Sequence, residues 1–272
     1  MSLSIVMIGD IVGKPGRRVV DQQVQRVRED CEADLVIANA ENIAGGSGLT
    51  AALAERLFSY GIDGLTLGDH VYRKADIIPM LERTDRVCRP ANLPEDAVGP
   101  RFLTLPARDG SRTLCVLTVL GRLYMSGGPL ADDPFAAVDM ILHELPSDAA
   151  VLVEVHAEAT SEKVALGHHL DGRVSAVVGT HTHIPTADAR VLPGGTAYVT
   201  DLGMTGPYDS VLGRRKDRVL QFMTTAIPAR FDVAEGDVKL CGVHITLDDA
   251  NKATACRRLE YPADLDRPPF AE

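Results

Sequence analysis

The segment Val151–Thr186, VLVEVHAEATSEKVALGHHLDGRVSAVVGTHTHIPT, decides the fold of this chain. The mostly apolar runs Ala149–Val155 and Val174–Val178 predict two buried strands within and beside it. Three histidines follow these strands: His156, His181 and His183. In open α/β sheets, functional groups collect beyond the carboxyl ends of the strands. We therefore expect the three histidines to meet at one edge of a sheet.

The first 70 residues repeat this arrangement three times. Apolar runs at Ile5–Ile8, Leu35–Ala38 and Leu65–Leu67 predict strands, and the helical spacing of Arg17–Glu29 and Ala51–Tyr60 predicts helices between them. Thr50 is the expected cap of the second helix and Gly61 its stop. Polar groups end each strand: Asp10, then Glu41 and Asn42, then Asp69 and His70. The alternation predicts an α/β fold with a parallel or mixed sheet covered by helices.

The rest of the chain continues with short elements and no linker, so we expect a single domain over residues 1–272. Between Val219 and Thr246 the sequence predicts short strands, and the glycine-rich Gly203–Gly213 predicts an irregular loop. The polar, proline-containing tail Asp264–Glu272 is expected to be frayed. The further predicted elements are helices at Ala75–Glu82 and Pro134–Glu144 and strands at Arg101–Leu105, Thr113–Val119 and Thr196–Thr200.

Composition excludes several classes of protein. The net charge of −10 argues against sequence-independent binding of DNA or RNA, which needs a basic surface. The five cysteines form no C-x-x-C pair, which is typical of reduced thiols in a cytoplasmic protein. The N-terminus lacks the features of a signal peptide, and no run approaches the roughly 20 apolar residues of a membrane span. We therefore expect a cytoplasmic protein without a membrane segment.

The polar groups at the strand ends have the chemistry of a metal site. Carboxylates, an amide oxygen and imidazoles form the mixed oxygen and nitrogen set that binds Mn, Fe or Zn, and thiolates are missing from it. The set is too large for one tetrahedral ion, whereas two ions about 3.5–4 Å apart could use nearly all of it. The members are Asp10, Glu41, Asn42, Asp69, His70, His156, His181 and His183.

Six sequence blocks carry a family resemblance, which extends from Ile5 to about Asp248. The blocks are GDIVGKPGR, NAENIAGGSGLT, CRPANLP, HAEATSEK, VVGTHTHIPTAD and TDLGMTGPYDSVLG. In this order they resemble the YmdB-like branch of the calcineurin-like metallophosphoesterases. The resemblance implies a four-layer metallophosphoesterase sandwich, in which two mixed β-sheets are flanked by helices. It also implies a 2′,3′-cyclic-nucleotide 2′-phosphodiesterase that additionally acts on 3′,5′-cyclic AMP.

The same resemblance implies a role for each polar group. Glu41 would bridge two metal ions, and His70 would be the general acid. The first metal would be held by Asp10, Asn42 and His183, and the second by Asp69, His156 and His181. The ions would be Fe or Mn, with Zn or Mg as further candidates. In the implied mechanism, a metal-bridging hydroxide attacks phosphorus and His70 protonates the leaving alkoxide.

Two positions depart from the pattern of the resemblance. Many metallophosphoesterases have Asp-x-His at the first strand end, whereas here Asp10 is followed by Ile11 and Val12, so Asn42 would take the place of that histidine. Similar proteins have Asn-His where this chain has Asp69-His70. With Asp69, two divalent ions and three carboxylates leave a charge of about +1, whereas Asn would leave about +2. We therefore expect tighter metal binding and a weaker pull on the substrate anion.

Three questions stay open at this point. Arg89, in CRPANLP, could bind a substrate phosphate or could hold its own loop. The same metals would also suit a phosphomonoesterase or a nuclease, although the acidic charge disfavours a long polymeric substrate. A third interpretation is a metal-containing regulatory or sensor protein with little turnover. The sequence leaves room for a homo-oligomer, and the partner it predicts is a small cyclic nucleotide.

Overall fold

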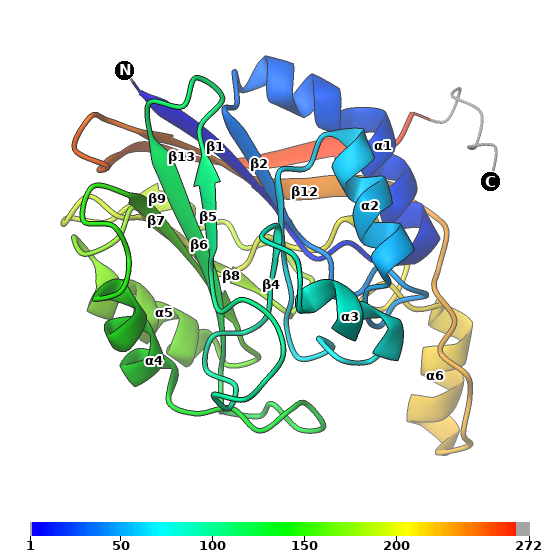
Figure 1. Cartoon of the computed structure of the whole chain (residues 1–272). Coiled ribbons are helices and arrows are strands. Elements are labelled where there is room, and N and C mark those ends of the chain that lie inside the picture. The colour runs from blue at the N-terminus through cyan, green and yellow to red at the C-terminus, as the bar shows by residue number, and fades with distance from the viewer. Residues whose placement is uncertain (1, 265–272) are drawn as a thin grey trace.

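The computed structural model describes residues 2–264 and shows two mixed sheets packed face to face (Figure 1). Within this range the first sheet contains seven strands, in the order β11-β12-β1-β2-β3-β4 with β13 paired to β12. They are β1 (Leu3–Ile8), β2 (Leu35–Asn39), β3 (Gly64–Thr66), β4 (Val87–Cys88), β11 (Gly206–Pro207), β12 (Val238–Leu247) and β13 (Ala253–Pro262). Strands β1 to β4 are parallel, and β12 joins β1 in the antiparallel direction.

The second sheet has the order β5-β6-β7-β8-β10-β9. Its strands are β5 (Leu103–Pro106), β6 (Thr113–Leu120), β7 (Ala150–His156), β8 (Ala176–Thr180), β9 (Arg190–Val191) and β10 (Ala197–Val199). Strands β6, β7, β8 and β10 are parallel, with antiparallel β5 and β9 at the two edges. The register places Leu120, His156 and Thr180 side by side, so three parallel strands end at the same level.

Helices cover the outer faces of both sheets, which gives the four-layer sandwich that the sequence predicted (Figure 1). One outer core contains Val19 and Val24 of α1 and Leu57 of α2 packed on β1 and β2, and the other contains Val138 of α4 and Leu166 of α5 packed on β6 and β7. The helices are α1 (Gly13–Asp30), α2 (Ala51–Tyr60), the 3₁₀ turn η1 (Ala75–Ile77), α3 (Ile78–Leu81), α4 (Pro134–Leu142), α5 (Thr160–Leu170) and α6 (Lys216–Thr225).

The strands alternate between these outer cores and a third core between the sheets. In β1, Ile5 and Met7 face the other sheet, whereas Val6 and Ile8 face α1. Strands buried on both faces read as continuous apolar runs, which is why the sequence predicted them well. The expected ends of α2 are also confirmed, because the Thr50 hydroxyl accepts from Leu53 N and Gly61 stops the helix with a φ of 110°.

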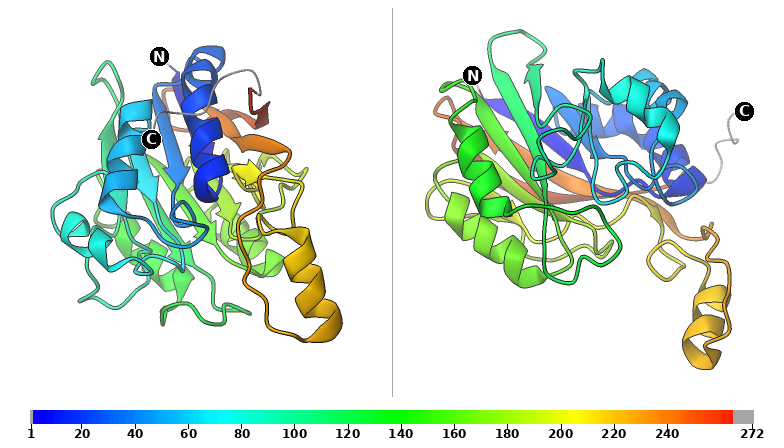
Figure 2. Two further views of the ribbon diagram at one scale, coloured as in Figure 1. Left: turned by 90° about the vertical axis from the view of Figure 1, so that its right-hand side faces the viewer. Right: turned by 60° about the horizontal axis from the view of Figure 1, so that its bottom comes forward.

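Helix α6 corrects one prediction. The sequence predicted short strands from Val219 onward, but Lys216–Thr225 is a helix that projects from the body of the molecule (Figure 2). Leu220 and Met223 are 55% and 71% exposed, and Val219 is the buried residue of this helix. Val219, Phe222 and Met223 lie three and four residues apart, which is the spacing of a helix, so the strand prediction overlooked a helical pattern that the sequence contains.

The described part of the chain contains no helix that is long and apolar enough to cross a membrane. Residues 265–272 of the expected frayed tail lie outside the described residues.

Candidate metal centre

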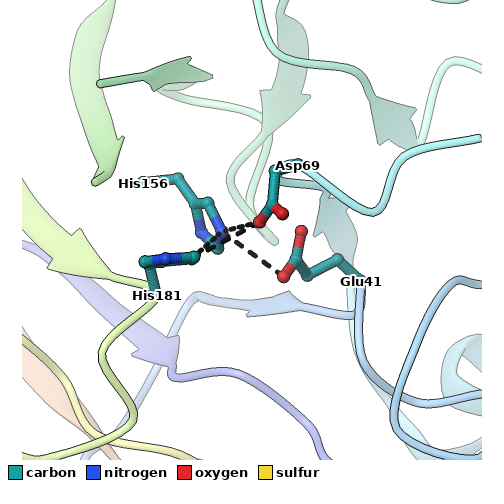
Figure 3. Close-up of side chains that lie close together, drawn as sticks. All are labelled: Glu41, Asp69, His156 and His181. Carbon is teal, nitrogen blue, oxygen red and sulfur yellow. Dashed lines mark hydrogen bonds and ion pairs between the residues drawn. The ribbon is translucent and has the colours of Figure 1, made fainter. Parts of the chain in front are cut away.

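Four side chains from both sheets converge where the parallel strands end (Figure 3). His156 is the last residue of β7, and His181 follows β8 directly. Glu41 follows β2 and Asp69 follows β3, so the first sheet supplies the carboxylates and the second supplies the imidazoles. Packing the two sheets together is therefore what brings these opposite ligand types into contact.

The ligand atoms of Glu41, Asp69, His156 and His181 all lie within 4.8 Å of one another. Nε2 of His156 is 3.0 Å from Oδ1 of Asp69 and 3.3 Å from Oε1 of Glu41. Nδ1 of His181 is 3.1 Å from the same Nε2 atom. Carboxylate oxygens and imidazole nitrogens at this spacing can share a first-row metal ion.

The other three predicted ligands adjoin this cluster. Asn42 Nδ2 lies 2.9 Å from Oε1 of Glu41 and 3.3 Å from Nε2 of His183. Oδ2 of Asp10 accepts the backbone N–H of His181 at 3.2 Å, and Oδ1 of Asp10 lies 3.9 Å from Nδ1 of His156. The structure thus brings all seven sequence-predicted ligands to one end of the sandwich.

Asp10 provides the test of whether a cation fits here. Its side chain is 0% exposed, and Oδ1 has no hydrogen-bond partner among the described residues. An isolated buried carboxylate oxygen is costly, and buried charges are normally paired or bound to metal. The donor set and this unpartnered oxygen both fit a bound cation.

The loop that carries His181 and His183 has an unusual backbone. His181 has a φ of 92° and His183 a φ of 66°, values that residues other than glycine seldom adopt. Between them, the backbone N–H and hydroxyl of Thr182 both donate to Oδ2 of Asp201, at 3.2 and 2.7 Å. Buried Lys163 donates to the same oxygen at 2.7 Å. The Lys163–Asp201 ion pair therefore holds the strained loop in place.

Hydrogen bonds orient two of the imidazoles toward the cluster. Nδ1 of His183 lies 3.1 Å from the carbonyl oxygen of Leu212, so Nδ1 carries the proton and Nε2 presents its lone pair. Nδ1 of His156 lies 2.9 Å from the hydroxyl of Thr180. A contact at the far ring nitrogen is the usual way in which a protein orients a metal-binding histidine.

His70 stands beside the cluster and faces the cavity. Its backbone N–H donates to Oε2 of Glu41 at 3.0 Å, and Nδ1 donates to Oδ1 of Asn42 at 2.8 Å. Nε2 lies 3.7 Å from Oδ2 of Asp69. The side chain is partly exposed, so Nε2 can meet a ligand that enters from solvent.

Burial raises the pKa of the carboxylates in the cluster, whereas the neighbouring histidines lower it, and the balance differs from one carboxylate to the next. Burial raises the pKa of Asp10 to about 7, and the charges of Glu41 and Asp201 add to this effect against the opposing charge of His156. Burial opposes ionisation of Glu41 too, but the charge of His156 and the hydrogen bonds from His156 and His70 together outweigh it, so the pKa of Glu41 lies well below its usual range. Hydrogen bonds from His156 and His181 likewise overcome burial and lower the pKa of Asp69.

The pKa values of the histidines also move in different directions. Burial alone would lower the pKa of His156, but the charge of Glu41 and the hydrogen bond to Asp69 raise it well above its ordinary value. The pKa of His70 is raised by its interaction with Glu41, against the effect of burial. Burial lowers the pKa of His183, which keeps its ring in the neutral form that binds metal. When no cation is bound, a proton on His156 carries the positive charge between the carboxylates.

Gly68 is required by the closeness of these groups. A Cβ atom at this position would lie 2.3 Å from Oε2 of Glu41 and 2.4 Å from Nε2 of His156. Both neighbours are fully buried, so neither can move aside without disturbing the cluster. Only glycine lets β3 approach the ligands of the other strands.

A cavity of about 230 Å³ opens over the cluster. His70, His181 and His183 line it on the cluster side. Glu158, Leu212 and Arg214 complete the wall and were not identified from the sequence. Nε2 of His181 lies 3.4 Å from Oε2 of Glu158, and Arg214 donates to the carbonyls of Gly45 and Phe231. Glu158 and Leu212 lie within the blocks HAEATSEK and TDLGMTGPYDSVLG, but only the folded chain brings them and Arg214 to one cavity wall.

The surroundings of Arg89 bear on the two roles that the sequence left open for it. Its side chain is 2% exposed, and its guanidinium donates to the carbonyl oxygens of Ala97 at 3.0 Å and Pro90 at 2.8 Å. Its donors are therefore used within the Arg89–Pro94 loop and its surroundings, and Arg89 does not line the cavity over the cluster. The structure favours the alternative in which Arg89 holds its own loop.

Comparisons with known proteins agree with this geometry. A family model described as YmdB-like protein matches residues 6–259. The 2′,3′-cyclic-nucleotide 2′-phosphodiesterase of Bacillus subtilis is 42% identical over 251 residues, which cover 92% of this chain and 93% of that protein. A crystal structure of a novel phosphatase from Mycoplasma pneumoniae superposes with a TM-score of 0.90 at 30% identity, covering 97% and 95% of the two chains.

A more distant structure shares the fold alone. The 5′-nucleotidase precursor from Thermus thermophilus superposes with a TM-score of 0.58 at 13% identity, over 97% of this chain and 55% of that one. The four-layer architecture is therefore that of the metallophosphoesterases.

Proposed function

The chain belongs to the YmdB-like protein family, and from this premise we propose that it is a metal-dependent phosphodiesterase of small cyclic nucleotides. Its substrate would be a 2′,3′-cyclic nucleotide, opened to the 3′-phosphate, with 3′,5′-cyclic AMP as a second substrate. The observation that carries the proposal is the convergence of Glu41, Asp69, His156 and His181 within 4.8 Å. The name of the Bacillus subtilis relative supports the substrate class.

The proposed cofactor is a pair of Fe or Mn ions. One ion would be held by Asp10, Asn42 and His183, the other by Asp69, His156 and His181, and Glu41 would be shared. Such a pair, when bound, lowers the pKa of water toward neutrality and stabilises negative charge on the phosphoryl oxygens. The unpartnered Oδ1 of Asp10 supports the first set, and the contacts of His156 with Asp69 and His181 support the second.

His70 is the proposed general acid. As the bond between water oxygen and phosphorus forms, the bond from phosphorus to the 2′ oxygen breaks and that oxygen needs a proton. Nδ1 of His70 is engaged with Asn42, so Nε2 is the nitrogen that faces the ligand. Its position beside the cluster, on the cavity wall, supports proton delivery to a leaving group bound there.

The cavity also supports a small substrate. Its volume of about 230 Å³ is slightly below the roughly 300–1,000 Å³ of typical small-molecule pockets. A net charge of −10 gives the whole molecule no attraction for a polyanion. Both observations favour a mononucleotide over an RNA chain.

The test is a substrate panel on protein loaded with Mn²⁺ or Fe²⁺. The panel comprises 2′,3′-cyclic AMP, 3′,5′-cyclic AMP, p-nitrophenyl phosphate and an RNA oligomer. We expect the highest kcat/KM for 2′,3′-cyclic AMP, with 3′-AMP as the product by chromatography. Preference for p-nitrophenyl phosphate or for RNA would contradict the proposal in favour of a phosphomonoesterase or a nuclease. A protein that binds the metals and hydrolyses none of the four would instead be a sensor.

A further inference from the structure

Glu154 is a fully buried carboxylate that lies beneath the candidate metal centre. It is 0% exposed and stands on β7, two residues before His156, so both side chains point to the same face of the strand. That face is directed at the other sheet, because Ala150 and Leu152 of β7 belong to the core between the sheets. A carboxylate in this layer interrupts an otherwise apolar interface, which calls for an explanation.

Three side-chain donors meet the Glu154 carboxylate, from both sheets. Oε1 accepts from Nδ2 of Asn39 at 2.6 Å and from the hydroxyl of Thr180 at 2.6 Å. Oε2 accepts from the hydroxyl of Thr118 at 2.9 Å. All three donors are fully buried. Thr180 and Asn39 also contact candidate metal ligands, whereas the Thr118 hydroxyl contacts Glu154 and no candidate ligand.

The first line of contacts runs from Glu154 through Thr180 to His156. A threonine hydroxyl has one proton, and Thr180 gives it to Glu154. In the 2.9 Å contact between Thr180 and Nδ1 of His156, the ring nitrogen must therefore be the donor. With its proton on Nδ1, neutral His156 presents the lone pair of Nε2 to Glu41 and Asp69, where a cation fits.

The second line runs from Glu154 through Asn39 to Glu41. The amide NH₂ of Asn39 donates to Glu154, so its oxygen points the other way and accepts the backbone N–H of Glu41 at 3.0 Å. This bond orients the segment just after β2, which carries both Glu41 and Asn42. One carboxylate thus sets the direction of a ligand from each sheet.

We propose that Glu154 is a positioning residue that fixes the Nδ1–H tautomer of His156 through Thr180 and the orientation of Glu41 through Asn39. The inference rests on the proposed function only in requiring that the centre binds metal. Contacts of this kind, one shell outside the ligands, typically change metal affinity by about 10–100-fold when they are removed. A buried carboxylate with a purely structural role would need its three hydrogen-bond donors, but those donors would not also have to contact candidate metal ligands.

Thr180 and Thr118 form a matched pair for the test. Both are buried threonines that donate a hydroxyl to Glu154, one from β8 and one from β6. Thr180→Val and Thr118→Val remove the same group with little change of shape, and we expect similar decreases in Tm. Only Thr180→Val cuts the line to His156, so we expect a roughly 10–100-fold loss of Mn²⁺ affinity in it alone. Thr180→Ser, which keeps the hydroxyl, should restore the affinity.

Isothermal titration of the metal-stripped, folded proteins with Mn²⁺ measures these affinities without a substrate. Glu154→Gln extends the test, because an amide oxygen in the place of Oε1 still accepts from Thr180 and Asn39, and we expect it to bind metal nearly as well as the wild type. Equal Mn²⁺ affinity in Thr180→Val and Thr118→Val would overturn the proposal, as would a wild type that binds no Mn²⁺. A wild type that binds Mn²⁺ but hydrolyses no cyclic nucleotide would refute only the proposed function.

Discussion

Oδ1 of Asn42 lies 2.8 Å from Nδ1 of His70, so a proposed metal ligand also orients the proposed acid. The amide of Asn42 reaches Glu41 and His183 on its other side. A carbonyl oxygen has two lone pairs, so Asn42 can accept from His70 and still bind a cation. This arrangement couples the direction in which His70 offers its Nε2 proton to the geometry of the centre.

Replacing His70 by alanine tests its role as acid. We expect His70→Ala to retain its metals and to lose about 10²–10⁴-fold in kcat on 2′,3′-cyclic AMP, because the leaving 2′ oxygen is no longer protonated. A diester with a p-nitrophenolate leaving group needs no such proton and serves as the matched control. Equal losses on both substrates, or full turnover on the cyclic nucleotide, would remove His70 from this role.

Asp69→Asn tests the charge argument made from the sequence. Oδ1 of Asp69 lies 3.0 Å from Nε2 of His156 and 3.4 Å from Nδ1 of His181, within the candidate centre. Loss of its charge raises the net charge of the loaded centre from about +1 to about +2. We expect weaker Mn²⁺ binding by calorimetry and tighter inhibition by inorganic phosphate. Unchanged metal affinity would show that the argument is wrong.

Metal removal is expected to lower the thermal stability of the folded protein. A ligand at 100 times its Kd stabilises the native state by about 2.7 kcal/mol, so stripping the metal with a chelator should reduce Tm measurably. Asp10→Asn replaces the unpartnered carboxylate by an amide, and we expect it to lose much of the increase in Tm that metal produces. If added Mn²⁺ raised the Tm of both proteins equally, Asp10 would not be a ligand.

The Lys163–Asp201 pair is expected to support both stability and the centre. Its two groups are buried and 2.7 Å apart. Removing one partner of a buried pair typically costs about 3–5 kcal/mol, so Lys163→Met should lower the free energy of unfolding in urea strongly. Lys216→Met breaks the exposed ion pair with Asp209 and is the matched control, with a loss of about 0–1 kcal/mol. Similar losses in the two variants would contradict this account.

Metal binding is expected to strengthen as the pH rises. Burial raises the pKa of Asp10 to about 7, and Glu41 and Asp69 raise the pKa of His156 well above its ordinary value. Both groups must lose a proton before they bind a cation. The apparent Mn²⁺ affinity should therefore fall as the pH drops below about 7, with protons released on binding. Calorimetric titration in buffers of different ionisation enthalpy counts these protons. An Mn²⁺ affinity that does not change with pH would show that metal binding does not require Asp10 and His156 to lose protons.

Much of the architecture was predictable because it depends on local patterns. Continuous apolar runs such as Ile5–Ile8 identified strands that are buried on both faces. The polar residues directly after those strands, including Glu41 and Asp69, identified the candidate centre. Helix α6 was missed although its apolar residues have helical spacing, because the prediction for Val219–Thr246 was short strands throughout. Arg89 was ambiguous because no local pattern tells a guanidinium that faces solvent from one that meets carbonyls of its own loop.

By itself, the sequence determined the order of most helices and strands and the identity of the polar groups at the strand ends. Only the tertiary structure decided which of those groups meet. The contact of His156 with Asp69 joins residues from different sheets. The hydrogen bonds of Glu154 likewise depend on the register of β7 with β8 and on the packing of β2 across the interface. The spacing of apolar residues, and hence which residues are buried, can be read from short stretches of sequence. The distances between side chains that are far apart in the chain are set only when the two sheets pack together.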